Sequence, residues 1–334
     1  MSQIFKAAVV QAAPVLFDTP RTIEKVADLT RAAASQDARL VVFPEAFVGG
    51  YPKGLDFGAR LGMRSPEGRE DFRRYYESAI ELPSQEAARL GEIARNNSVH
   101  LVVGIIERDG GTLYCTAVTY DPAGRLISKH RKLMPTALER LVWGFGDGST
   151  IGVAETALGR IGSVICWENY MPLLRTAMYA QGVELYCAPT VDDRDTWLPT
   201  MRTIALEGRC FVISACQYFT RGDGPADYSP LQGDDPATVL IRGGSCIVDP
   251  LGTVLVEPDF SGEAIKVAEI DRRVIVRGKY DLDVVGHYAR PDVFRLSVDT
   301  RSKAAVSFPV LRPDALSEKD ASEPESQEAM PCSA

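Results

Sequence analysis

The sequence predicts an α/β fold in which sheets buried on both faces are covered by helices. Short apolar runs rich in Val and Ile alternate with longer segments of helical periodicity. Continuous apolar strands are typical of sheets covered on both faces, and their alternation with helices is typical of layered α/β domains. Of the 334 residues, 45% are hydrophobic and 25% are charged, which is enough to form a sizeable core. Because no Gly/Ser-rich or Pro-rich linker divides residues 1–312, we predict a single domain there.

The first predicted helix covers residues 19–34. Its pattern places Ile23, Val26 and Ala33 on one face. Asp18 or Thr19 can cap the first turn, where a proline such as Pro20 is favourable. The same approach predicts another helix and five strands in this part of the chain: the helix at 84–96, and the strands at 5–11, 40–43, 101–107, 112–120 and 126–132.

Two turn signals of the same type mark hairpins in the rest of the chain. Asp-Pro-Ala-Gly at 121–124 and Asp-Pro-Leu-Gly at 249–252 are each flanked by apolar runs. The shared pattern hints at related halves of a sheet system. Further elements are predicted from the same signals: strands at 160–166, 183–187, 211–216, 245–248 and 253–256, and helices at 172–181 and 198–209.

Composition and charge argue against several classes of protein. The net charge of −8 and the absence of a dense basic patch disfavour binding to nucleic acid or to an anionic membrane. The chain has no run of about 18 apolar residues that would span a membrane and no secretory signal at its start, so we expect a cytoplasmic protein. Seven cysteines without a CxxC pair disfavour a disulfide framework or a structural zinc site.

The last segment of the chain has a different composition. Residues 313–334 are rich in Asp and Glu and contain almost no large apolar side chain. Such a segment buries too little surface to offset the entropy lost on ordering. We therefore predict an acidic, disordered C-terminal tail.

Three reactive side chains stand at the ends of predicted strands. They are Glu45, Lys132 and Cys166, and Cys166 also stands just before a predicted helix. Catalytic groups in layered α/β folds gather at the carboxyl ends of strands, where loops leave polar atoms facing a crevice. The three residues are therefore candidates for one site.

A carboxylate, an ammonium and a thiol suit nucleophilic catalysis. Lys132 would favour the thiolate form of Cys166 near neutral pH. Glu45 could take the thiol proton as general base and return it to a departing nitrogen. The ammonium and the backbone N–H of Trp167 could stabilise negative charge that develops on the substrate.

Each of these residues also has an ordinary structural interpretation. A cysteine that ends an apolar strand is usually core filler, and Cys187 ends such a strand in the same way. Glu45 could be a solvated loop acid. Lys132 belongs to a basic run of the kind found at a solvated strand edge. Only the combination favours catalysis.

A Cys–His hydrolase is the main alternative that the residues leave open. His100, His130 and His287 have no distinctive context for a partner of the nucleophile, although none is excluded by its position. The sequence has no Walker loop, dinucleotide fingerprint, HExxH or GxSxG motif. We interpret the glycine-rich residues 144–148 as a turn-forming loop.

Three motifs resemble those of the nitrilase superfamily. FPEAFVGGYP around Glu45, HRKLMPT around Lys132 and CWENYMP from Cys166 are similar to its glutamate, lysine and cysteine motifs, in the same order. TALER and WGFGDGS after Lys132, and GHYARPDVF at 286–294, resemble the nitrilase branch of this superfamily more than its amidase branches. The resemblance implies that Glu139 is a second, supporting glutamate. Thr203 departs from it, since many relatives have histidine there.

The resemblance implies a fold, an assembly and a reaction. The fold is a four-layer αββα sandwich, in homodimers joined through helices that often build larger oligomers, with no metal and no organic cofactor. The reaction is hydrolysis of an organic nitrile by water to the carboxylic acid and ammonia, through a covalent Cys166 thioimidate and thioester. Glu45 would act as general base, and Lys132 would stabilise the tetrahedral intermediate.

The substrate pocket and the substrate itself are less determined. Tyr51, Trp167 and Thr190 are candidates to line an apolar pocket, although core packing explains aromatic residues equally well. An aliphatic amidase or a cyanide-degrading relative would use the same reactive residues. A catalytically silent scaffold of the same fold is a further alternative, which the intact reactive side chains disfavour.

Overall fold

The structure is a computed structural model that describes residues 3–304 and 306. Residues up to Arg301 form one compact unit, and the fold described below is that of this unit. The predicted acidic tail, residues 313–334, and the predicted domain boundary at residue 312 lie outside the described residues.

The first of two large sheets has six strands. They are β1 (Ile4–Gln11), β2 (Ala38–Val42), β5 (His100–Asp109), β6 (Thr112–Tyr120), β7 (Leu126–Arg131) and β16 (Ala264–Asp271). Their order in the sheet is β16-β1-β2-β5-β6-β7, with β1, β2 and β5 parallel and the outer strands antiparallel to their neighbours. The five strands predicted from the first part of the chain are confirmed.

The second large sheet also has six strands. They are β8 (Val153–Thr156), β9 (Gly159–Ser163), β10 (Leu185–Cys187), β11 (Phe211–Ser214), β14 (Cys246–Val248) and β15 (Val254–Val256). Their order is β15-β14-β11-β10-β9-β8, with β9, β10 and β11 parallel. Two small two-stranded sheets pair β3 (Ala59–Arg60) with β4 (Met63–Arg64) and β12 (Tyr218–Thr220) with β13 (Val239–Arg242).

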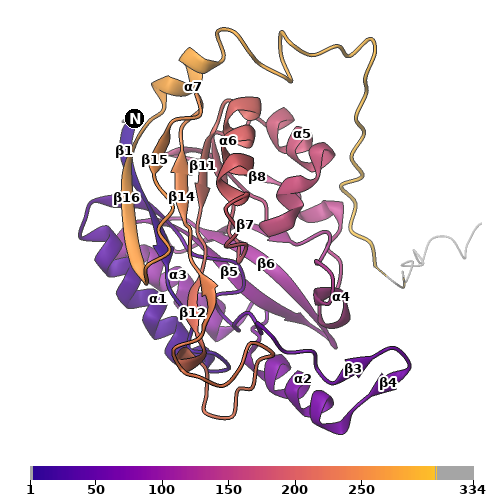
Figure 1. The fold of residues 1–334 in the computed structure, drawn as a ribbon. Coiled ribbons are helices and arrows are strands. Elements are labelled where there is room, and N and C mark those ends of the chain that lie inside the picture. Colours follow the sequence, from indigo (N-terminus) through magenta and orange to yellow (C-terminus); the bar gives the residue numbers. More distant parts are fainter. Residues whose placement is uncertain (1–2, 305, 307–334) are drawn as a thin grey trace, which may run out of the picture. The chain divides into compact units, whose positions relative to one another are not determined.

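Helices cover the outer face of each large sheet (Figure 1). On the first sheet these are α1 (Thr19–Ala34) and α3 (Gln85–Asn97), and on the second they are α5 (Pro172–Ala180) and α6 (Trp197–Gly208). The predicted cap of α1 is confirmed, because the Asp18 side chain accepts a hydrogen bond from the N–H of Arg21. In the described part of the chain, no helix has the length and apolar character needed to cross a bilayer.

Alternation along the strands distributes their side chains among separate cores. In β1, Val9 faces the core between the two sheets, whereas Val10 faces the core beneath α1 and α3. In β10, Cys187 faces the core between the sheets and Tyr186 packs beneath α5 and α6. Successive side chains of a strand point to opposite faces, so both sheets are covered on both sides. The predicted four-layer αββα arrangement is confirmed.

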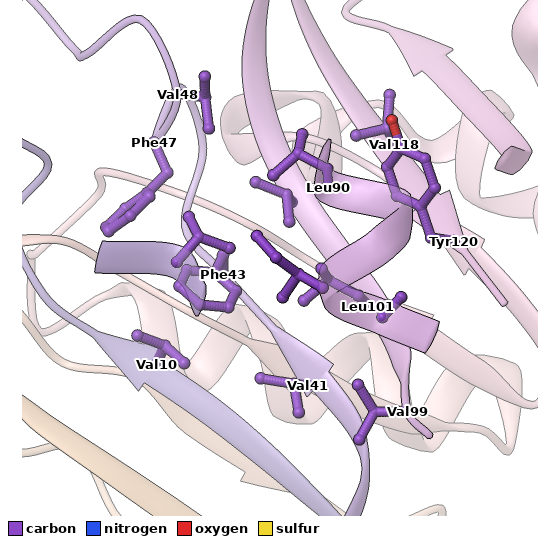
Figure 2. Close-up of a cluster of buried hydrophobic side chains, with 14 of the residues drawn as sticks. Val10, Val41, Phe43, Phe47, Val48, Leu90, Val99, Leu101, Val118 and Tyr120 are labelled. Carbon is purple, nitrogen blue, oxygen red and sulfur yellow. The ribbon is translucent and has the colours of Figure 1, made fainter. Parts of the chain in front are cut away.

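The core beneath α1 and α3 also holds the segment that follows β2. Phe43 and Phe47, just beyond this strand, are buried in one cluster with Val10 of β1 and Leu90 of α3 (Figure 2). Their rings pack edge to face with centroids 5.1 Å apart. Burial of an aromatic side chain of this kind contributes about 1.5–3 kcal/mol. The turn between the two rings, residues 44–46, is therefore anchored at both ends.

Both predicted Asp-Pro turns form hairpins. In each turn the aspartate, Asp121 or Asp249, accepts hydrogen bonds from the backbone N–H groups two and four residues later. The first turn joins β6 to β7 at one edge of the first sheet, and the second joins β14 to β15 at one edge of the second sheet. The two sheets thus share an edge motif.

Several elements differ from the sequence prediction. The helix α2 (Pro66–Ser78) and the strand β16 were not predicted, because α2 is mostly polar and β16 carries charged residues that interrupt its apolar pattern. The predicted strand at 160–166 ends at Ser163, and Cys166 instead begins the short 3₁₀ helix η2 (Cys166–Tyr170). Four other short helices complete the unit: α4 (Glu139–Val142), η1 (Gly148–Thr150), η3 (Arg221–Asp223) and α7 (Arg273–Gly278).

Candidate active site

The reactive residues predicted at strand ends converge, although they come from different sheets. Glu45 follows β2 and Lys132 follows β7 in the first sheet, whereas Cys166 follows β9 in the second. Lys132 Nζ lies 2.6 Å from Glu45 Oε1 and 2.8 Å from Glu139 Oε2. The charges of these three residues all act on the Cys166 thiol. The structure therefore brings all four side chains into one site.

Glu45 is positioned by close packing of its turn. Gly104 of β5 lies against this turn, and a Cβ on it would come within 2.7 Å of Glu45 Cα and 2.2 Å of the Pro44 carbonyl oxygen. Only glycine permits so close an approach. Gln217 Nε2 donates to the backbone oxygen of Glu45 at 2.8 Å, and Cys115 Sγ lies 3.5 Å from Glu45 Oε1. Oε2 is buried, with no ordinary hydrogen-bond partner among the described residues.

The charges of Glu45 and Lys132 are shaped by burial and by each other. Burial raises the pKa of the Glu45 carboxyl group, and Lys132 lowers it only in part. Burial alone would lower the pKa of Lys132, but the negative charges around it, chiefly that of Glu45 and also that of Glu139, keep it well above its usual value. The site thus combines a permanent cation with a carboxylate that has an increased affinity for a proton. A general base needs that affinity.

Cys166 lies on a turn that holds its backbone in an unusual conformation. Its φ is +50°, in the left-handed region that costs a residue with a side chain about 1–2 kcal/mol. The N–H of Cys166 donates to the Pro189 carbonyl at 2.9 Å, and Asn169 Nδ2 donates to the Cys166 carbonyl at 2.7 Å. The hydroxyl group of Thr190 donates to Cys166 Sγ at 3.2 Å. Strained backbone of this kind clusters at reactive residues.

The structure corrects one expectation about the thiol. The sequence suggests that Lys132 favours a thiolate in the free protein. Burial and then the negative charge of Glu45 raise the pKa of Cys166, and Lys132 offsets this only in part. The thiol is therefore protonated at neutral pH, and the nucleophile has to be generated by proton transfer.

A cavity of about 220 Å³ opens over Cys166. Tyr51 and Trp167 lie in its wall, where the Tyr51 hydroxyl donates to Glu139 Oε1 at 2.8 Å and Trp167 Nε1 donates to Asp192 Oδ2 at 2.8 Å. Thr190 is fully buried and contacts the sulfur instead of lining the cavity. The other residues that line it are Lys53, Thr136, Glu139, Val191, Asp192, Asp193 and Arg194.

The three histidines do not partner Cys166. His130 contacts Glu168 and a backbone carbonyl, His100 lines a separate cavity with Asp121, and His287 is exposed. The geometry therefore gives no support to a Cys–His pair. Within residues 3–304 and 306, no three His, Cys, Asp or Glu side chains are grouped as a metal site would require.

Sequence reasoning missed the buried residues that support the site. Glu168 lies two residues after Cys166, and its carboxylate accepts hydrogen bonds from the N–H groups of Leu133 and Ile165. Its place inside the cysteine motif could have drawn attention to it. Gln217 and Cys115 approach Glu45 from distant parts of the chain, and no local pattern marks them.

This fold is that of the enzymes that hydrolyse carbon–nitrogen bonds. The model of the carbon–nitrogen hydrolase family matches residues 6–280, and the chain belongs to that family.

Similar proteins place it in the nitrilase branch, as its motifs predict. It is 61% identical to the nitrilase blr3397 of Bradyrhizobium diazoefficiens, over 91% of this chain and 94% of the relative. It is 59% identical to an aliphatic nitrilase of Sinorhizobium fredii, over 90% and 98% of the two chains. A bifunctional nitrilase/nitrile hydratase of Nicotiana tabacum, NIT4B, is 53% identical over 91% and 88%.

Solved structures confirm the fold at lower sequence identity. Nit3 of Saccharomyces cerevisiae, from the nitrilase superfamily, has a TM-score of 0.64 at 24% identity, covering 86% of this chain and 97% of that one. The NitFhit protein of C. elegans has a TM-score of 0.70 at 19% identity, covering 90% of this chain and 69% of that one.

Proposed function

We propose that the protein hydrolyses an organic nitrile to the carboxylic acid and ammonia, with Cys166 as the nucleophile. The observation that carries this proposal is the contact of one buried ammonium, Lys132, with both Glu45 and Glu139 beside a cavity that reaches Cys166. The names of the relatives support a nitrile as the substrate class.

The first step forms the covalent bond. Glu45, whose Oε2 is free to accept, takes the thiol proton as Cys166 Sγ attacks the nitrile carbon. One π bond of the C≡N group breaks, and its electron pair moves to nitrogen, which takes the proton from Glu45. The product is a neutral thioimidate on Cys166.

The second step releases ammonia. A water molecule adds to the thioimidate carbon while Glu45 takes one of its protons, which gives a tetrahedral intermediate. Lys132 and the Trp167 N–H stabilise the negative charge that develops on it. The nitrogen receives this proton from Glu45 and then, again by way of Glu45, the proton of the new hydroxyl group. It leaves as ammonia while the C=O bond forms, so that a thioester remains.

The third step frees the enzyme. A second water molecule, again deprotonated by Glu45, attacks the thioester, and the sulfur leaves and recovers its proton. The overall reaction consumes one nitrile and two water molecules and yields one carboxylic acid and one ammonia. If the earlier intermediate expels sulfur instead of ammonia, the product is an amide. Glu139, held by Tyr51, would keep Lys132 in place and balance its charge.

The experiment that tests this mechanism is trapping of the acyl-enzyme. The protein is incubated with butyronitrile, benzonitrile or phenylacetonitrile, quenched in acid and digested for mass spectrometry. We expect the substrate acyl group on the peptide that contains Cys166, together with ammonia in solution. Turnover of a nitrile without any adduct on that peptide, and unchanged turnover in Cys166→Ala, would rule out the covalent mechanism.

The same assay distinguishes the alternative substrates. Ammonia release is compared for a nitrile, for the corresponding amide and for cyanide at equal concentration. A nitrilase releases ammonia fastest from the organic nitrile. Faster release from the amide would indicate an aliphatic amidase, and faster conversion of cyanide would indicate a cyanide-degrading enzyme.

Assembly as a homodimer that builds larger oligomers is also part of this proposal. Exposed apolar side chains, including Tyr170, Leu173 and Leu206, lie on η2, α5 and α6. Such side chains could be buried by a second copy of the chain. Light scattering after size-exclusion chromatography should give at least a dimer for the wild type and a smaller particle for Leu173→Glu. A monomeric wild type would contradict the proposal.

A further inference from the structure

A buried carboxylate connects the lysine and the cysteine of the site. Glu168 Oε1 accepts a hydrogen bond from the N–H of Leu133, the residue after Lys132. Glu168 Oε2 accepts one from the N–H of Ile165, the residue before Cys166, at 3.0 Å. The carboxylate thus bonds the backbone directly beside both reactive residues.

This connection crosses between the two large sheets. Lys132 continues from β7 of the first sheet, whereas Cys166 and Glu168 follow β9 of the second. The distance between the ammonium and the sulfur therefore depends on how the sheets are held together at this point. Packing of apolar side chains is not directional, whereas hydrogen bonds to a fixed carboxylate define distances and angles.

His130 provides the opposite charge for Glu168. Its Nε2 lies 3.0 Å from Glu168 Oε2, and its Nδ1 lies 3.2 Å from the carbonyl oxygen of Thr150. A carbonyl oxygen only accepts, so Nδ1 carries a proton. An ionised carboxylate also only accepts, so Nε2 carries one as well. The pair is then an imidazolium and a carboxylate.

Burial makes this pairing necessary. The side chains of His130 and Glu168 are only 4% and 0% exposed. Burial alone would lower the pKa of His130, but the charge of Glu168 and the hydrogen bonds with Glu168 and the Thr150 carbonyl together outweigh this effect and raise it. A carboxylate without a counter-ion is unfavourable at such a depth. His130 therefore supplies the counter-charge for a carboxylate that accepts from both N–H groups.

We propose that Glu168 is a positioning residue that sets Cys166 against Lys132, with His130 as its counter-ion. This inference rests on the proposed roles of Cys166 and Lys132. Glu168 touches the backbone on either side of the reacting atoms and contributes no proton or bond to the reaction. A change at Glu168 should therefore slow the chemical step and leave substrate binding largely intact.

The first test is Glu168→Gln, which keeps the size of the side chain. An amide has one acceptor oxygen and one NH₂ donor, so in either orientation the NH₂ group meets an N–H donor. We expect kcat, expressed per Cys166 that iodoacetamide can titrate, to fall about tenfold to a hundredfold, with KM close to that of the wild type. The titration is carried out after limited proteolysis and size-exclusion chromatography have removed unfolded chains, so that a loss of stability alone would leave this kcat unchanged.

A matched control is available at the opposite end of β9. Glu184 also accepts a hydrogen bond from a backbone N–H, that of Arg160 in β9. It forms an ion pair with Arg272, which follows β16 of the first sheet. Glu184→Gln thus removes a carboxylate that links the sheets far from the cysteine. It should lower stability and leave kcat per titrated site at the wild-type level.

His130→Gln is the second variant, and it leaves Glu168 itself unchanged. It should lower kcat in the same direction, because Glu168 loses its counter-ion. Wild-type kcat per titrated site in both Glu168→Gln and His130→Gln would overturn the inference, as would an equal loss in Glu184→Gln. Failure of the proposed function gives a different result, since Cys166→Ala would then remain active.

Discussion

Cys187 ends β10 and Cys166 follows the neighbouring parallel strand β9; both are buried, but their surroundings differ. Burial raises the pKa of both thiols, to about 12 for Cys187. Cys187 faces the apolar core between the sheets, and burial alone accounts for its shift. Cys166 has Glu45, Lys132 and Thr190 around it and a cavity above it. Burial therefore does not separate a reactive thiol from an inert one, whereas the charged groups from the other sheet do.

The path of the backbone explains the difference. β10 runs through Cys187, so the alternation of side chains sends its sulfur into the core. β9 ends at Ser163, and the chain turns before it reaches Cys166. Because of this turn and the positive φ of Cys166, its sulfur does not follow the strand alternation of side chains and points toward Glu45 instead. Comparing substitutions at the two cysteines therefore tests whether the surroundings of Cys166 make it the nucleophile.

The largest effect should separate the two cysteines themselves. Cys166→Ala should lower turnover of nitriles about a millionfold, as removal of a covalent nucleophile does in other enzymes. Cys187→Ala should keep wild-type kcat and lose about 1 kcal/mol of stability, because only a small cavity forms in the core. Ammonia release and urea denaturation measure the two effects. Comparable turnover in the two variants would contradict the assignment.

The next effect concerns the base that Cys187 lacks. Glu45→Gln should lower kcat about 10²- to 10⁴-fold, the usual contribution of a general base. The base acts in its ionised form, and its pKa is raised above the usual 4.5. Activity of the wild type should therefore be complete at higher pH and fall as the pH is lowered through this raised pKa. A pH–rate profile measures this, and an acid limb unchanged in Glu45→Gln would show that another group titrates.

A smaller effect should follow from crowding the turn that carries Glu45. Gly104→Ala places a Cβ against Pro44 and Glu45, and overpacking of this kind costs about 1–3 kcal/mol. We expect lower stability together with a lower kcat, since the carboxylate is displaced. Gly111→Ala is the control, because a Cβ on Gly111, between β5 and β6, would meet nothing within 4 Å. Equal kcat values for the two variants would mean that Gly104 does not position the base.

The smallest effect concerns the hydroxyl group beside the sulfur. In the wild type, the hydrogen bond from the Thr190 hydroxyl group to Cys166 Sγ lowers the pKa of the thiol. Thr190→Val removes this bond, and a bond of this kind contributes about 0.5–1.5 kcal/mol. Alkylation of Cys166 by iodoacetamide should slow about threefold to tenfold, because the loss of this hydrogen-bond energy lowers the rate by about that factor. Thr203→Val, on the exposed side of α6, should leave the rate unchanged. Equal rates in both variants would exclude a role for Thr190.

Local patterns in the sequence determined much of this protein. The spacing of apolar residues and the cap at Asp18 predicted α1 correctly, and the two Asp-Pro turns formed the hairpins expected of them. Glu45, Lys132 and Cys166 could be selected because each stands at the end of a predicted strand. Such features depend on neighbours a few residues apart, so the sequence displays them.

The tertiary structure decided which of these residues meet and in what state. Glu45 and Lys132 are 87 positions apart, and Gln217 reaches Glu45 across 172. Neither separation leaves a periodic signal. The protonated thiol of Cys166 and the link through Glu168 arise only when two sheets pack face to face and exclude water from the groups between them. Desolvation and pairing of charges are properties of that packed arrangement, and so the folded chain alone defines them.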